Sequence, residues 1–273
     1  MKIGSDEYNL MLIDTNIIRE LLNFQSNTRK GFFHKAFLSE TKYAPCFSIY
    51  NVIELMPYND LFEKFVDIFS EIPCLMLFTA KQFIEAEYDA FINGDSLQIN
   101  CKLANSFTPV IDNESYNLRK FINRLKKESS LITVIQNEVY NLPSIANEWE
   151  KGRREISKVS ERLNEKDYLK NEARTLLKDI INWGINPEVE INVEKFPALR
   201  IMAYSQFMRV HLTQKKIKPN DVLDVLISSA IPYVDAVLTE NYQADIYKKA
   251  KKHIRQLGDL EILTLKDIRV YSV

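Results

Sequence analysis

The stretch LMLIDTNIIRELL, residues 10–22, decides the fold class of this chain. Its first four residues are all apolar, which is typical of a short buried strand. Asp14 ends that run, and apolar residues then recur at positions 17, 18, 21 and 22, the spacing of one helix face. The stretch therefore predicts a strand, an acidic residue at the strand end, and a helix.

Further short apolar runs alternate with helical patterns along the chain. We predict strands at residues 74–78, 235–239 and 261–265, and the run at residues 43–47 leads to Ser48. We predict helices after Ser48, which is a plausible N-cap residue, near residues 83–88, at 221–226 and at 244–257. Such alternation predicts an α/β fold with a mainly parallel central sheet. Ligands of such folds bind at the carboxyl ends of the strands, where we expect Asp14 and Glu240 to lie.

The middle of the chain differs from its two ends. From about residue 114 to 183 the pattern is strongly helical and charged. Leu118, Phe121, Ile122 and Leu125 form one apolar stripe at helical spacing. A second stripe runs from residue 169 to 180, and Gly184 is well placed to end that helix.

Composition excludes several classes of protein. The 36 basic and 37 acidic residues give a net charge of −1, so the chain is not a strongly basic nucleic-acid-binding protein, although local patches can still bind nucleic acid. Three widely spaced cysteines argue against a disulfide framework and favour a cytoplasmic location. Neither a signal peptide nor a membrane span is expected, so we predict no membrane partner.

Acidic residues from four segments are expected at one edge of the sheet. These are Asp14, Glu54, the pair Asp221 and Asp224, and Glu240. Carboxylates gathered in one place repel one another and lose hydration. A hard cation such as Mg²⁺ or Mn²⁺ relieves both costs, because it prefers oxygen ligands. Such an ion polarises a phosphodiester and activates a water, so the pattern favours metal-assisted phosphodiester hydrolysis.

Four motifs, in this order, resemble those of the PIN-domain nuclease family. Residues 12–18 (LIDTNII) resemble its first strand and helix, and residues 48–55 (SIYNVIEL) resemble its second motif, a helix that carries a glutamate. Residues 221–226 (DVLDVL) and 231–239 (IPYVDAVLT) resemble the third and fourth. The resemblance implies a three-layer α/β/α fold, one or two Mg²⁺ or Mn²⁺ ions, and ribonuclease activity. Ribonuclease toxins of toxin–antitoxin pairs are common members.

The same resemblance implies the roles of individual residues. Asp14, Glu54, Asp224 and Glu240 would be the catalytic metal ligands. Side chains that would orient these ligands or replace one of them are Thr15, Asn16, Ser48, Asn51, Asp221, Thr239 and Asn241. The simpler alternatives are helix caps for Asp14 and Asp221 and a solvated position for Glu54.

Two features depart from the family pattern. The last family acid usually lies two residues after the threonine of the final strand, where this chain has Asn241. Either Glu240 reaches the metal, or Asn241 supplies a neutral oxygen, or the fourth ligand position is lost. The chain is also about twice the usual length. We therefore predict a nuclease core formed by residues 1–90 and 200–273, with residues 91–199 as a helical insertion.

These patterns lead to ranked functional hypotheses. The first is a Mg²⁺- or Mn²⁺-dependent endonuclease acting on RNA, with single-stranded DNA as an alternative substrate. Further options within this hypothesis are a toxin held by an antitoxin-like protein and a homo-oligomer. Its phosphate contacts would come from Lys248, Lys249, Lys251, Lys252 and Arg255, which otherwise form a solvated helix face. The alternative is a degenerate relative that binds nucleic acid or protein without cleavage. A weaker third hypothesis is another Mg²⁺-dependent phosphate-transfer enzyme.

Overall fold

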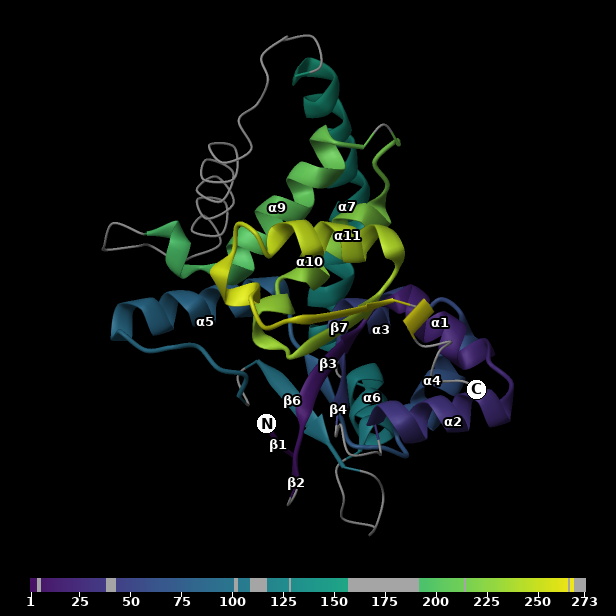
Figure 1. Ribbon diagram of the computed structural model, residues 1–273. Helices are drawn as coiled ribbons and strands as arrows, with labels where there is room; N and C mark the ends of the chain where they lie inside the picture. The colour runs from purple at the N-terminus through teal and green to yellow at the C-terminus, as the bar shows by residue number, and fades with distance from the viewer. Residues whose placement is uncertain are drawn as a thin grey trace.

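A six-stranded, mostly parallel sheet forms the centre of the computed structural model (Figure 1). The structure describes residues 1–3, 6–37, 43–100, 103–108, 117–127, 129–156, 192–213, 215–264 and 266–267. The strand order is β6-β5-β4-β3-β7-β8, and only β5 and β6 pair antiparallel. The strand bounds are β3 Asn9–Ile13, β4 Tyr43–Ser48, β5 Cys74–Leu77, β6 Ala104–Phe107, β7 Ala236–Thr239 and β8 Glu261–Thr264. A separate two-stranded hairpin joins β1 (Lys2–Ile3) and β2 (Asp6–Glu7).

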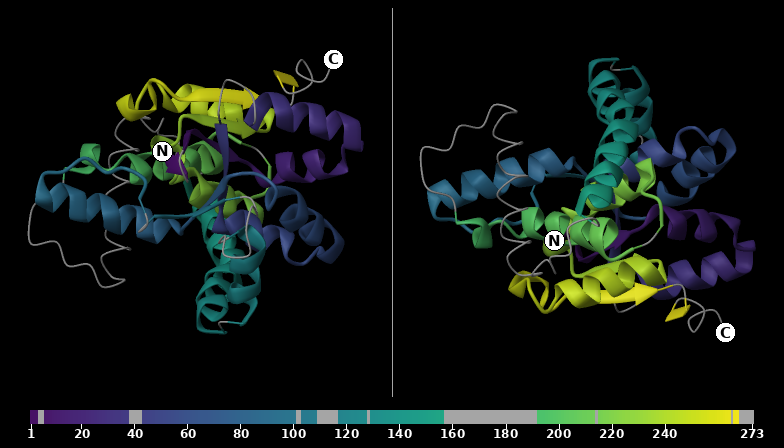
Figure 2. Two further views of the ribbon diagram at one scale, coloured as in Figure 1. Left: turned by 90° about the horizontal axis from the view of Figure 1, so that it is seen from below. Right: turned by 90° about the horizontal axis from the view of Figure 1, so that it is seen from above.

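Ten α-helices lie in the part of the chain that the structure describes (Figure 2). Those in the first half are α1 Thr15–Asn23, α2 Ser26–Phe37, α3 Ile49–Leu55, α4 Asn59–Phe69 and α5 Ala80–Asn93. The others are α6 Leu118–Lys127, α7 Ser129–Ile156, α9 Pro197–His211, α10 Pro219–Ser228 and α11 Asn241–Ala250. Short 3-10 turns are η1 Val193–Lys195, η2 Ile231–Tyr233 and η3 Arg255–Leu257. None of the described helices combines the length and apolarity needed to cross a membrane.

The predicted α/β class and mainly parallel sheet are confirmed. The apolar runs form β3, β4, β5, β7 and β8, and α3 ends at Leu55, two residues before Pro57. Proline ends a helix because it lacks the N–H donor and clashes with the preceding turn. The stripe at residues 169–180 and Gly184 lie outside the described residues.

Some elements differ from the prediction. The helix predicted at 244–257 is wrong in its bounds, because α11 ends at Ala250 and a turn and η3 follow it. Strand β6 was not predicted, since only Ala104 and Phe107 of its four residues are buried, as suits an edge strand. It lies within the range assigned to the helical insertion, yet it pairs with β5. Helix α9 is buried on all sides and therefore lacks the two-faced pattern that marks a surface helix.

Parallel pairing brings several helix starts to one edge of the sheet. Strand β3 pairs in parallel with β4 on one side and with β7 on the other. The strands β4, β5 and β6 therefore lie on one side of β3, and β7 and β8 lie on the other side. Helix α1 starts two residues after β3 ends, whereas α3 follows β4 directly. Helix α11 begins two residues after β7 ends. This edge is the usual place for a ligand site in an open α/β sheet.

A buried glutamate connects α5 to α9. Glu87 is 2% exposed, and its Oε1 accepts hydrogen bonds from the Ala198 N–H at 2.6 Å and from the Tyr233 hydroxyl. Its Oε2 has no hydrogen-bond partner among the described residues. Burial raises the pKa of Glu87 to about 8, against the smaller opposing effect of these donors. The structure therefore favours a protonated Glu87 at neutral pH.

Glu87→Gln should reduce the pH dependence of stability. The raised pKa means that the folded chain binds a proton more tightly than the unfolded chain, so this stabilisation is present below about pH 4.5 and is lost as pH rises through about 8. Glutamine mimics the protonated acid, so the variant should lose less of its Tm than the wild type between about pH 6 and pH 9. Thermal unfolding measures this.

Glu85→Gln is the matched control, because Glu85 lies on the same helix but forms only an exposed ion pair with Lys81. The role assigned to Glu87 is wrong if the two variants show the same decline in Tm across this pH range.

Candidate functional site

Asp14 lies at the carboxyl end of β3, at the centre of the sheet. It occupies the N-cap position of α1, but its side chain makes no capping hydrogen bond. Instead, its Oδ2 accepts a hydrogen bond of 2.7 Å from the hydroxyl of Thr239, the last residue of β7. Its backbone N–H donates to Leu238 at 3.0 Å. The carboxylate is therefore positioned by the neighbouring strand and does not serve as a helix cap.

A relay of hydrogen bonds connects the start of α3 to the start of α1. The Asn51 Oδ1 accepts from the Ser48 N–H at 2.7 Å, and the Asn51 Nδ2 donates to the Thr15 Oγ1 at 2.8 Å. Thr15 in turn hydrogen-bonds the Glu54 side chain. All three polar partners, Ser48, Asn51 and Thr15, are buried. The relay ties the start of α3, the helix that carries Glu54, to the start of α1.

The charge environment of Glu54 agrees with this placement. Burial raises the pKa of Glu54, the hydrogen bond from Thr15 and the nearby Arg19 lower it, and Asp14 raises it. An effect of Asp14 on Glu54 requires the two carboxylates to be neighbours. Arg19 also donates a 3.5 Å hydrogen bond to the Glu54 backbone carbonyl. The ionisation of Glu54 is therefore linked to that of Asp14.

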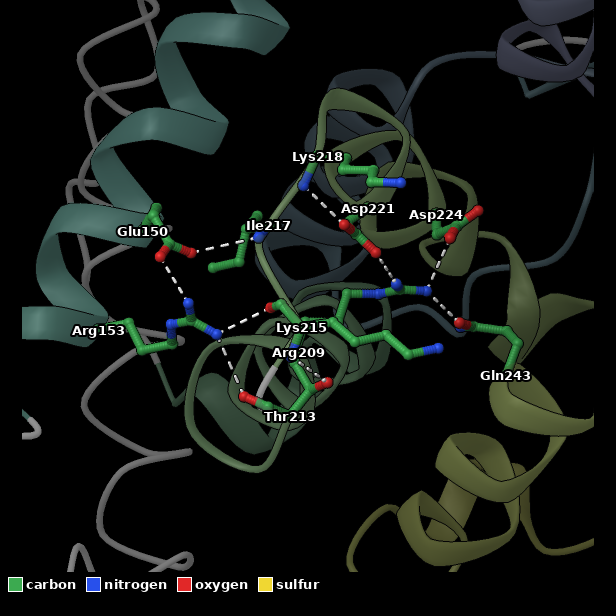
Figure 3. A network of polar contacts seen from close by, with 10 residues as sticks. All are labelled: Glu150, Arg153, Arg209, Thr213, Lys215, Ile217, Lys218, Asp221, Asp224 and Gln243. Atoms are coloured by element: carbon green, nitrogen blue, oxygen red, sulfur yellow. Dashed lines mark hydrogen bonds and ion pairs between the residues drawn. The ribbon is translucent and has the colours of Figure 1, made fainter.

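The two acids of α10 share one arginine (Figure 3). Arg209 of α9 forms ion pairs with Asp221 Oδ1 at 2.6 Å and with Asp224 Oδ2 at 2.8 Å. Asp221 also accepts from the Lys218 N–H at 2.7 Å, so it caps the start of α10. Burial raises the pKa of Asp224; Arg209 lowers it, and Asp14, Glu54 and Asp221 raise it. The pKa of Asp224 is thus raised by three other acids of the site.

The fourth corner holds Glu240, with Asn241 beside it. Glu240 occupies the N-cap position of α11 without capping it, and Asn241 is the first, exposed residue of that helix. Burial and Asp14 raise the pKa of Glu240, whereas a hydrogen bond from Asn16 lowers it. Glu240, held by Asn16, is therefore the residue that takes part electrostatically in the cluster.

The donor chemistry of this edge suits a hard cation, but its present arrangement is not a closed metal site. Asp14 raises the pKa of Glu54, Asp224 and Glu240, and a divalent ion would stabilise the charged forms of such carboxylates. Yet no three histidine, cysteine, aspartate or glutamate side chains converge as a ligand group within the described ranges. Asp14 is engaged by Thr239 and Asp224 by Arg209. An ion would require Asp224 to exchange partners.

Three residues at this site were absent from the prediction. Arg209 reaches the acids from α9, and Gln243 and Tyr247 of α11 line a small pocket together with Asp14, Asp224 and Thr239. Gln243 accepts a hydrogen bond from Arg209. The sequence carries no signal for Arg209, because its helix is buried on nearly all sides and its pattern distinguishes no face toward the site.

Helix α7 holds the loop that connects α9 to α10 (Figure 3). Glu150 pairs with Arg153 at 2.5 Å and accepts from the Ile217 N–H at 3.2 Å. Arg153 donates to the backbone carbonyls of Thr213 at 3.3 Å and Lys215 at 2.8 Å. These bonds fix the chain just before Asp221 and Asp224. The region predicted as an insertion therefore helps to position the site.

The basic residues lie at the far end of α11 and beyond it. Lys248, Lys249, Lys252 and Arg255 are exposed. Lys249 pairs with Asp245 at 2.8 Å, and Lys251 donates to the Leu260 carbonyl at 2.8 Å. Lys248 and Lys249 lie in the last turn of α11, which begins after Glu240, and the others lie in the turn and in η3 that follow it.

Replacing Thr239 by valine should destabilise the fold. Valine keeps the shape but removes the hydroxyl that Asp14 accepts, and losing a hydrogen bond to a charged group costs about 1–3 kcal/mol. Urea unfolding measures the free energy of unfolding. Thr239→Ser retains the hydroxyl and should recover most of the loss; equal stability of the valine variant and the wild type would contradict the assigned bond.

Comparisons with known proteins give this chain no relatives. No family model matches the sequence, and neither the curated proteins nor the solved structures contain a match. What this chain does must therefore be inferred from its own residues.

Proposed function

We propose that this chain is a metal-dependent endonuclease of the PIN type, with a three-layer α/β/α core, that hydrolyses phosphodiester bonds in RNA. The observation that carries the proposal is that Asp14 and Asp224, from separate elements, line one small pocket, and that Asp14 raises the pKa of Glu54 on a third element. A fold stabilises such a costly arrangement poorly unless a cation joins it. Helix α11 begins at this edge after its N-cap residue Glu240, and the basic residues lie in its last turn and beyond it.

The side chains of the site would have two roles, as metal ligands and as the residues that position those ligands. Asp14, Glu54 and Asp224 would hold Mg²⁺ or Mn²⁺, with Glu240 as the fourth carboxylate. A bound ion would supply a polarised phosphate and an activated water. Thr239, Asn51 and Thr15 keep the carboxylates in place, as partners of metal ligands commonly do. No covalent intermediate on a side chain is needed.

Exposed tyrosines next to the acids support an unpaired nucleic-acid substrate. Tyr58 is 56% exposed and Tyr242 is 46% exposed. Arg19, which contacts Glu54, lies 5.1 Å from the centre of the Tyr58 ring, and Arg209 lies 5.6 Å from that of Tyr242. Aromatic rings stack on the bases of single strands without regard to sequence. An RNA or DNA single strand fits this edge better than a duplex.

The ion pair between Arg209 and Asp224 favours one other function. A resident arginine neutralises the acids as a metal would, so a chain that keeps it in place would bind nucleic acid or protein without cleaving. Titration with Mn²⁺ by calorimetry discriminates the two functions, since a non-cleaving relative should not bind Mn²⁺ below millimolar concentrations. We propose an antitoxin-like protein partner only for the nuclease function.

Asp14→Asn should abolish cleavage. We expect the rate on a panel of RNAs and single-stranded DNAs with Mn²⁺ to fall by about 100-fold or more, because one ligand charge is lost. Asp235→Asn is a matched control. Asp235 lies at the opposite end of β7 and accepts from the Leu10 N–H at 2.6 Å, which asparagine still permits. Equal activity of wild type and Asp14→Asn would refute the nuclease proposal.

Neutralising the basic end of α11 should weaken RNA binding in a salt-dependent way. For Lys248→Ala, Lys252→Ala and Arg255→Ala combined, the slope of log affinity against log salt should fall by up to about 2. Fluorescence anisotropy with a labelled single-stranded RNA measures it. The triple variant of Lys30, Lys64 and Lys127, exposed on α2, α4 and α6, has the same net charge and should keep the wild-type slope. An unchanged slope in the α11 variant would exclude this surface.

A further inference from the structure

Arg209 has an unusual position for a basic residue. It is 3% exposed, and among the lysines and arginines whose side chains the structure describes it alone is buried. Its helix, α9, is buried from Pro197 to Val210 apart from Arg200. A guanidinium without water around it needs anions or carbonyls close by. Arg209 finds them only at the acidic edge of the sheet.

The contacts of Arg209 differ in kind. Its Nη1 binds Asp221, whereas its Nη2 is shared between Asp224 and Gln243. Its Nε has no hydrogen-bond partner among the described residues. Asp221 also caps α10 by accepting a hydrogen bond from the Lys218 N–H, and this bond holds Asp221 in place independently of Arg209. Asp224 has no such capping role and faces the pocket shared with Asp14 and Thr239.

We propose that Arg209 is a resident counter-cation that a divalent ion displaces from Asp224. This inference rests on the proposed metal-dependent function. The guanidinium and an ion require the same carboxylate oxygens, and two cations at that distance repel each other. Arg209 would keep Asp221 and Gln243 as partners and give up Asp224. The two acids of α10 thus have separate roles: Asp221 holds the arginine, and Asp224 is passed to the metal.

Such a competition has a measurable consequence. Each binding event must release the Arg209–Asp224 contact, so Arg209 lowers the affinity of the site for cations. A variant without the positive charge should bind the ion more tightly. The same variant should be less stable without metal, because Asp221 and Asp224 lose their shared partner. Metal should restore more stability to it than to the wild type.

The experiment is a titration of the full chain with Mn²⁺ alone. Calorimetry measures the affinity, and thermal unfolding measures the change in Tm. Arg209→Met should bind Mn²⁺ about 10-fold more tightly than the wild type and show a larger rise in Tm at saturation. Arg209→Gln removes the charge but keeps hydrogen bonding, so it carries the test if the methionine variant does not fold. Neither readout depends on cleavage.

Arg153→Met is the matched control. It removes a partly buried arginine from the clamp between α7 and the α9–α10 loop, and should destabilise the chain without tightening Mn²⁺ binding. Unchanged or weaker Mn²⁺ affinity in folded Arg209 variants, beside a wild type that binds, overturns the inference and leaves the nuclease proposal standing. Absence of Mn²⁺ binding in wild type and variants alike overturns both.

Discussion

Repulsion among carboxylates at one edge of the sheet is the constraint on which the rest of this structure depends. Asp14, Glu54 and Asp224 reach that edge from the end of β3, from α3 and from α10; Asp14 raises the pKa of Glu54, and both raise the pKa of Asp224. The surrounding structure offsets this repulsion locally. Thr239 donates to Asp14, Thr15 to Glu54, Asn16 to Glu240, and Arg209 to Asp224. Each of these four polar side chains is a hydrogen-bond or ion-pair partner of an acid at the site.

These polar side chains join helices that are far apart in the sequence. Buried Asn51 spans α3 and α1, and Arg209 spans α9, α10 and α11. Helix α7, far from the sheet edge in sequence, secures the loop before α10 through Glu150 and Arg153. Because buried polar groups are costly when a partner is missing, such bonds specify one arrangement of the helices. The middle region of the chain therefore contributes to the site through packing.

For the proposed function, a cation bound among the acids would matter more for holding a phosphate group than the basic surface does. The net charge of the chain is −1, and the basic residues after Ile246 lie toward the end of α11, away from the acids at its start. A phosphate group approaching the acids would be repelled unless a positive charge lay between them. Arg209 provides one such charge now, and a divalent ion would provide a stronger one.

The sequence by itself determined the strands, the helix starts and the acids that follow them. Apolar runs ending in Asp14, Ser48 and Thr239 mark strand ends because local periodicity and capping act within a few residues. Only the tertiary structure decided which partner each acid has. Arg209 on a helix buried all round, the antiparallel edge strand β6, and the buried Glu87 beneath α9 have no local pattern. Their roles arise from contacts between residues far apart in the chain, which no sequence window contains.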